Sequence, residues 1–161
     1  MNILRFLFGF FMTILLLSCH YKKENSPLGT WQLTSWQTIA DSSVQYPYGK
    51  DAKGILIYTK EGKVSLTLAY NKRDTFDSND RSQLDAESAK KAFNSYFAYI
   101  GNYQVDPIDK KIKHQIELCL LPNWQGTEQI RNYQLLNNDS LVLSADRVLG
   151  KYHLLQWRRV N

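Results

Sequence analysis

The chain has 161 residues, with 20 Lys and Arg against 15 Asp and Glu and a formal charge of +5. This length suits one domain with a single hydrophobic core. The basic residues fall in scattered pairs and not on one basic helix, which argues against nucleic acid as a partner. The three histidines show none of the close ligand spacings of zinc sites, so we predict no metal and no other cofactor.

The first segment has the pattern of an export signal. Arg5 precedes an almost unbroken apolar run at 6–17, which suits a signal peptide and is too short to span a bilayer comfortably. The run ends in Leu-Leu-Ser-Cys at 16–19, which resembles the lipobox of bacterial lipoproteins. This resemblance implies that residues 1–18 are removed and that Cys19 becomes a lipidated N-terminus.

The chain is therefore expected to have three parts: a signal peptide at 1–18, a lipidated cysteine with a polar tether at 19–27, and a folded domain at 28–161. His20 stands where an aspartate would favour retention in an inner membrane. The predicted location is the cell envelope, with the lipid in the outer membrane of a Gram-negative bacterium. We expect the membrane as the partner of Cys19, and a monomeric protein.

The composition and turn pattern of the remaining residues indicate antiparallel β-structure. The chain has ten Tyr and four Trp, and turn signals recur about every ten residues. Residues 42–51 carry Pro47 and Gly49 and are expected to form a loop, and 60–63 form a hairpin turn. We predict eight strands, at 28–36, 54–59, 64–70, 102–106, 112–121, 126–136, 140–144 and 151–160.

After residue 85 the spacing of the apolar side chains changes from every two residues, as in a strand, to every 3.6 residues, as in a helix. Apolar side chains recur from Ala89 to Ile100 at the spacing of one helical stripe. Asp85 is a plausible N-cap, and Gly101 stands beyond the expected end. We predict one helix here, packed as a lid across the mouth or side of a barrel.

Several sequence motifs match a known family and are spread over nearly all of the predicted domain. They are Leu28-Gly29-Thr30-Trp31-Gln32-Leu33, Tyr48-Gly49-Lys50-Asp51-Ala52-Lys53-Gly54, Ile57-Tyr58-Thr59, Tyr96-Phe97-Ala98-Tyr99-Ile100-Gly101-Asn102-Tyr103, Pro122-Asn123-Trp124-Gln125-Gly126-Thr127 and Trp157-Arg158-Arg159-Val160. With these motifs the chain resembles the lipocalin-like domain family, small bacterial and fungal proteins mostly of unknown activity. The resemblance implies a lipocalin-like barrel. With the elements predicted above, the expected fold is mainly β: a single antiparallel eight-stranded barrel with one α-helix between strands three and four. The resemblance carries over no catalytic residue.

The motif Gly29-x-Trp31 also looks like the lipocalin signature near the first strand. In lipocalins that tryptophan lies at the closed end of the barrel under an arginine of the last strand. The resemblance therefore implies barrel closure by Trp31 with Arg158 or Arg159.

Strand parity selects the side chains that face the barrel interior. In 112–120 the even residues form an apolar face that includes His114, and in 127–135 the odd residues form the better inward face. Buried His and Arg need hydrogen-bond partners or a ligand that supplies them. The candidate ligand-binding residues are His114, Gln129, Arg131, Tyr133, Tyr58, Tyr103 and, at an entrance, Trp124.

Three functions fit these residues. The first is a membrane-anchored protein that binds a small apolar or amphipathic ligand with an acidic or polar head in the barrel. The second is a structural or envelope-stress lipoprotein with a filled barrel. The third is an isomerase, cyclase or hydrolase with His114 as general base. We see no nucleophile elbow, carboxylate pair or metal signature in favour of an enzyme.

The lipobox gives the first testable prediction. Replacing the acceptor thiol in Cys19→Ala should abolish lipid attachment and leave the protein unprocessed or released. Metabolic labelling with an alkyne fatty acid measures this directly, with Cys119→Ala as the matched control that keeps its label. Equal label on Cys19→Ala and wild type would contradict the assignment.

Overall fold

The computed structural model describes residues 26–41, 43–148 and 150–160. The expected signal peptide, Cys19 and most of the tether lie outside them. In the described part the elements follow in this order: β1 (Gly29–Ala40), β2 (Ser43–Gln45), β3 (Lys53–Tyr58), β4 (Lys63–Ala69), the 3-10 turn η1 (Arg81–Gln83), α1 (Ala86–Asn94), β5 (Tyr96–Asp106), β6 (Lys111–Cys119), the 3-10 turn η2 (Pro122–Trp124), β7 (Glu128–Leu136), β8 (Ser140–Val148) and β9 (Lys151–Arg159).

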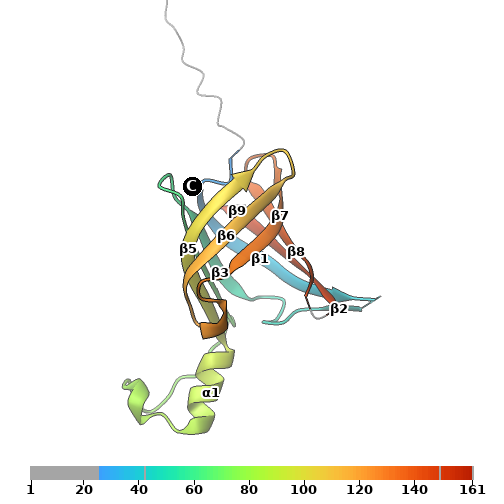
Figure 1. The fold of residues 1–161 in the computed structure, drawn as a ribbon. Helices are drawn as coiled ribbons and strands as arrows, with labels where there is room; N and C mark the ends of the chain where they lie inside the picture. The colour runs from blue at the N-terminus through green and yellow to red at the C-terminus, as the bar shows by residue number, and fades with distance from the viewer. Residues whose placement is uncertain (1–25, 42, 149, 161) are drawn as a thin grey trace, which may run out of the picture.

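Eight long strands form a closed antiparallel barrel, which confirms the expected fold class. Neighbours along the chain pair from β3 to β9, and β1 pairs with β3 on one side and with β9 on the other (Figure 1). The short β2, where a loop was expected, pairs with the end of β1. The helix accordingly lies between β4 and β5, and its expected place between strands three and four is wrong.

The helix is also shorter than its stripe suggested. Asp85 caps it as expected, because its side chain accepts a hydrogen bond from the Ser88 amide at 2.7 Å. It ends at Asn94, and Tyr96 already begins β5, which pairs with β4 from Tyr96 to Asn102. The aromatic residues that completed the helical stripe are strand residues, because pairing with β4 overrides the local period.

The helix does not act as a lid. None of its residues is buried, and it contacts β5 at its own C-terminal end. Figure 1 shows α1 extending away from the end of the barrel. Its amphipathic stripe therefore does not pack across the mouth or the side, as the sequence suggested.

A bulge changes the parity of β6. Ile112, His114 and Ile116 are buried as expected, but Leu118 is 57% exposed and Cys119 packs against the core. The register with β5 shifts between Ile100 and Gly101, so one extra residue of β6 turns the later side chains over. Only glycine fits at 101, since a Cβ there would lie 2.0 Å from the Gln115 carbonyl oxygen.

The barrel is closed at the end where β1 begins and β9 finishes. Trp31 is fully buried, and the Arg159 guanidinium lies over its ring with Cζ 4.0 Å from the centroid. Arg159 also donates hydrogen bonds to the carbonyls of Ser26, Leu28 and Asn138. Of the two arginines implied by the resemblance, Arg159 closes the barrel, whereas Arg158 is exposed because Trp157 before it faces inward.

No helix in the described ranges is long and apolar enough to cross a membrane.

Closure gives a stability prediction. Trp31→Ala removes a fully buried indole from the closed end and should lower the free energy of unfolding by about 3–5 kcal/mol. Trp36→Ala is the matched control, because Trp36 is only partly buried and should cost less. Chemical denaturation measures both, and an unchanged midpoint for Trp31→Ala would mean that this end of the barrel does not depend on its tryptophan.

Candidate functional site

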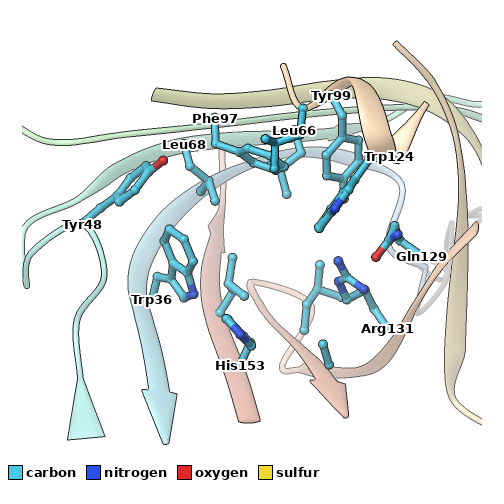
Figure 2. A pocket seen from close by; sticks show the side chains of 14 residues that line it. Trp36, Tyr48, Leu66, Leu68, Phe97, Tyr99, Trp124, Gln129, Arg131 and His153 are labelled. Carbon is cyan, nitrogen blue, oxygen red and sulfur yellow. The ribbon is translucent and has the colours of Figure 1, made fainter. Parts of the chain in front are cut away.

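The barrel contains a cavity of about 440 Å³ at the end opposite its closure (Figure 2). It is formed by the end of β1, the later half of β4, the start of β5, the η2 turn and the facing parts of β7, β8 and β9. Its lining residues are Trp36, Tyr48, Leu66, Leu68, Phe97, Tyr99, Leu121, Trp124, Gln129, Arg131, Leu143, Ala145, His153 and Leu155. The volume falls within the roughly 300–1,000 Å³ of small-molecule sites.

Most of the wall is apolar, and much of that is aromatic. Phe97 packs edge-on against Trp124, with ring centroids 5.3 Å apart, and Tyr99 lies 6.3 Å from the same indole. On the other side Tyr48 meets Trp36 edge-on at 4.9 Å. Figure 2 shows these two aromatic groups on separate parts of the wall with the cavity between them. Such a lining suits an apolar ligand body.

Three polar side chains also reach the cavity, namely Gln129, Arg131 and His153. Arg131 donates from Nη1 to the Ile130 carbonyl at 2.9 Å, and no carboxylate of the described chain forms a salt bridge with it. None of the fourteen lining residues is Asp or Glu. The cavity thus presents a permanent cation to any ligand that enters.

His153 is held neutral in this setting. Burial lowers its pKa below the ordinary value of 6.5, and the positive charges of Arg131 and Lys151 lower it further. Its ring lies beside that of Trp36, with centroids 6.3 Å apart. The indole Nε1 of Trp36 is buried and has no hydrogen-bond partner among the described residues.

Below the cavity, a layer of three polar side chains crosses the barrel interior. His114 is fully buried, and its Nε2 and Nδ1 bond to the hydroxyls of Tyr58 and Tyr99 at 2.8 and 2.7 Å. A neutral imidazole has one donor and one acceptor, so one tyrosine donates to the ring and the other accepts from it. Burial, followed by the charge of Arg131, lowers the pKa of His114 to about 3. Burial raises the pKa of Tyr99 to about 12, and it also raises the pKa of Tyr58 well above its usual range.

The structure divides the residues singled out from sequence into two groups. Gln129, Arg131 and Trp124 line the cavity. The remaining four do not line it: His114 and Tyr58 belong to the buried layer, Tyr103 donates from its hydroxyl to the Thr59 carbonyl at 2.9 Å, and Tyr133 is buried nearer the closed end. His114 is thus a core residue whose two ring nitrogens both have hydrogen-bond partners within the protein. Of the two possibilities, protein partners or a ligand, the structure shows protein partners.

Sequence reasoning missed the opposite wall, with Trp36, Tyr48 and His153. Parity within β9 could have found His153, because it shares the inward face of Leu155 and Trp157. Tyr48 lies in a predicted loop, where parity gives no direction. Trp36 follows a register shift in β1 between Leu33 and Ser35, which reverses the simple alternation.

Comparison with known protein families agrees with this fold. A family model described as a lipocalin-like domain matches residues 28–159. No curated protein matches the chain. Among solved structures, a de novo designed fluorescence-activating β-barrel matches with 11% identity and a TM-score of 0.41, over 83% of this chain and 93% of that one.

Two further solved structures have a TM-score of 0.44 and cover 87% of this chain. One is the tryptamine complex of the amine-binding protein of Rhodnius prolixus, with 14% identity and 66% of its chain covered. The other is a biogenic amine-binding protein, with 15% identity and 67% covered.

The buried histidine gives a pH prediction. The pKa of His114 is about 3 in the folded protein and near 6.5 when unfolded, so the unfolded state binds the proton first. Stability from this site is complete above about pH 6.5 and is lost as the pH falls toward 3, by roughly 1.5 kcal/mol between pH 6.5 and 5.

His114→Gln tests this, because glutamine offers both tyrosines a donor and an acceptor but does not titrate. Denaturation at several pH values should show a flatter profile for this variant than for wild type between pH 6.5 and 5. His153→Gln should retain the part due to His114. Parallel profiles for wild type and His114→Gln would show that the buried imidazole does not set the acid sensitivity.

Proposed function

We propose that this chain, which belongs to the lipocalin-like domain family, is a membrane-anchored protein that binds a small amphipathic ligand with an acidic head group in its barrel. One observation carries the proposal. A guanidinium, that of Arg131, lines an otherwise largely apolar cavity whose lining contains no carboxylate. Arg131 is partly buried and has no acidic partner in the described chain, so an anionic ligand group would complement its charge.

The guanidinium also suits such a ligand by its geometry. It is planar, stays charged at every physiological pH and offers paired N–H donors to a carboxylate or phosphate. Gln129 lies two residues before it on the same face of β7 and supplies a further amide. A cationic amine would meet Arg131 and no acid in this cavity, so we expect amines to be rejected.

The apolar part of the ligand is expected to lie against the aromatic and aliphatic walls. In Figure 2, Phe97, Trp124 and Leu66 lie along the upper side of the cavity, above Arg131. Burying an alkyl chain there contributes about 0.8 kcal/mol for each methylene group. The chain would therefore supply most of the affinity, and the head group the selectivity.

The other two functions find less support in the geometry. A filled barrel is at odds with a cavity of about 440 Å³. A general-base role for His114 needs a free ring nitrogen near the substrate, yet both nitrogens bond to tyrosines and burial makes the ring a weak base. Ligand binding is the function that the cavity supports best.

The anchor at Cys19 remains part of the proposal, and the place where the chain enters the barrel supports one orientation at the membrane. The chain enters the barrel at the closed end, where Arg159 holds the carbonyls of Ser26 and Leu28 and the Trp31 indole donates to the Pro27 carbonyl at 2.7 Å. The cavity lies at the other end. A lipid on Cys19 would thus hold the barrel by its closed end, with the mouth directed away from the bilayer.

Arg131→Leu tests the proposed head-group contact. Without a protein acid to leave unpaired, this variant should fold nearly as well as wild type but lose affinity for decanoate by about 10- to 100-fold, the 1.5–3 kcal/mol of a charged hydrogen bond. Titration calorimetry with decanoate measures the loss, and decanol should bind both proteins alike.

Arg158→Leu is the charge-matched control, because Arg158 faces outward on β9. It should bind decanoate as wild type does. A large loss of stability in Arg131→Leu, together with no decanoate binding by wild type, would make Arg131 a structural residue and overturn the proposal.

A further inference from the structure

A row of inward-facing residues crosses three strands at the level of Arg131. Asn132 pairs with Ser144, so the preceding Arg131 on β7 lies beside Ala145 on β8. Ala145 pairs in turn with His153 on β9. Because neighbouring strands are about 4.8 Å apart, the Arg131 and His153 backbones lie roughly 10 Å apart with one small residue between them.

The residue between them leaves a space. Ala145 is buried and contributes only a methyl group to the wall, while the longer side chains on both sides extend past it into the cavity. Figure 2 shows Arg131 and His153 on the same side of the cavity, both directed into it. A carboxylate- or phosphate-sized group over Ala145 would be within reach of both side chains.

The groups around His153 contain no acid that already serves it. Its neighbours in the described chain are neutral or cationic: Trp36 and Thr38 from β1, with Tyr48 behind Trp36, Ala145 from β8, Arg131 from β7, and Lys151 and Tyr152 from its own strand. Asp146 follows Ala145, but it is exposed on the outer face and accepts from the Asn132 amide at 3.2 Å. An acid for His153 would therefore have to come with the ligand.

The neighbouring indole points to the same kind of ligand. Trp36 Nε1 is a buried donor without an acceptor among the described residues. Figure 2 places this nitrogen on the side of the ring nearer His153. An unsatisfied buried donor costs free energy, which a ligand oxygen in this part of the cavity would offset.

We propose that Arg131 and His153 form a two-sided clamp over Ala145 that binds the anionic head group of an amphipathic ligand. This rests on the proposed function and adds its second head-group residue. Arg131 provides the permanent charge. His153 takes up a proton from solvent when the anion binds. The protonated ring keeps this proton, and its N–H donates a hydrogen bond to the head group.

The clamp links binding to pH with a definite sign. In the free protein burial and nearby cations lower the pKa of His153, and a bound anion raises it. The complex then holds more protons than the free protein, so affinity rises as the pH falls. An anion should therefore bind severalfold more tightly at about pH 5.5 than at about pH 8.

Decanesulfonate is the probe, because its head group stays ionised over this whole range. Calorimetry near pH 6.5 in two buffers of different ionisation enthalpy measures the protons taken up as it binds. Wild type should take up a measurable fraction of one proton. His153→Gln should take up none, and its affinity should no longer vary with pH.

Two controls test whether the pH effect needs His153 itself or only a nearby positive charge, and whether it needs an anionic head group. Lys151→Gln removes an exposed cation from the same strand and should still show proton uptake and a rising affinity at lower pH. Decanol should bind without proton uptake in every variant. Decanoate and decyl phosphate, compared at one pH, distinguish the two natural sources of an acidic head group.

The outcomes are distinct. Sulfonate binding that depends on Arg131 but shows no proton uptake and no effect of His153→Gln overturns the clamp and leaves the proposed function in place. No sulfonate or carboxylate binding by wild type overturns both. Equal proton uptake in wild type and His153→Gln would assign the titrating group elsewhere and also overturns the clamp.

Discussion

The hydrogen bonds of one buried histidine divide the barrel interior into two parts. Tyr58 on β3, Tyr99 on β5 and His114 on β6 meet in a layer that leaves neither ring nitrogen free. Toward the closed end the interior is filled, with Trp31 and Trp157 among its fully buried side chains. On the other side Tyr99 is also part of the cavity wall. The layer therefore fixes where the core ends and where a ligand can begin.

The free-energy cost of burying polar groups explains which side chains make up this layer. A buried imidazole and two buried hydroxyls are tolerable only while each finds a partner, and only while the imidazole stays neutral. Burial and the charge of Arg131 both oppose its protonation. Burial is the main reason that the pKa values of His114 and His153 are low, and the charge of Arg131 lowers both of them further. An anion beside Arg131 would weaken this effect of its charge on both histidines.

Much of the fold could be predicted because half-buried strands alternate with a period of two. That alternation, with the turn at 60–63, located the long strands and put Gln129 and Arg131 on the inward face of β7. It failed where pairing changes the local rule. The residues after Ser95 have helical spacing but join β4, and the bulge near Glu117 reverses the later side chains of β6. Neither event leaves a clear local signal.

The candidate site was harder to predict than the fold for a related reason. Parity identifies inward residues strand by strand, but a cavity depends on which strands face one another at the same height. His153 and Arg131 are 22 positions apart and become neighbours only through the register of β7, β8 and β9. His114 faces inward like a ligand contact. It is covered, however, because Tyr99 on the neighbouring β5 and Tyr58 on β3 bond to it. Whether other side chains cover an inward-facing residue depends on the tertiary structure and cannot be read from its own strand.

The central claim is that the space above the Tyr58–His114–Tyr99 layer holds an acidic amphipath. Native mass spectrometry of the barrel, expressed without its lipid in the host in which the chain occurs, tests it most directly. The account predicts a retained small molecule that carries an acidic group, is released on unfolding, and is missing from a preparation of Arg131→Leu. A protein that is empty as isolated, and remains empty after incubation with decanoate, would contradict it.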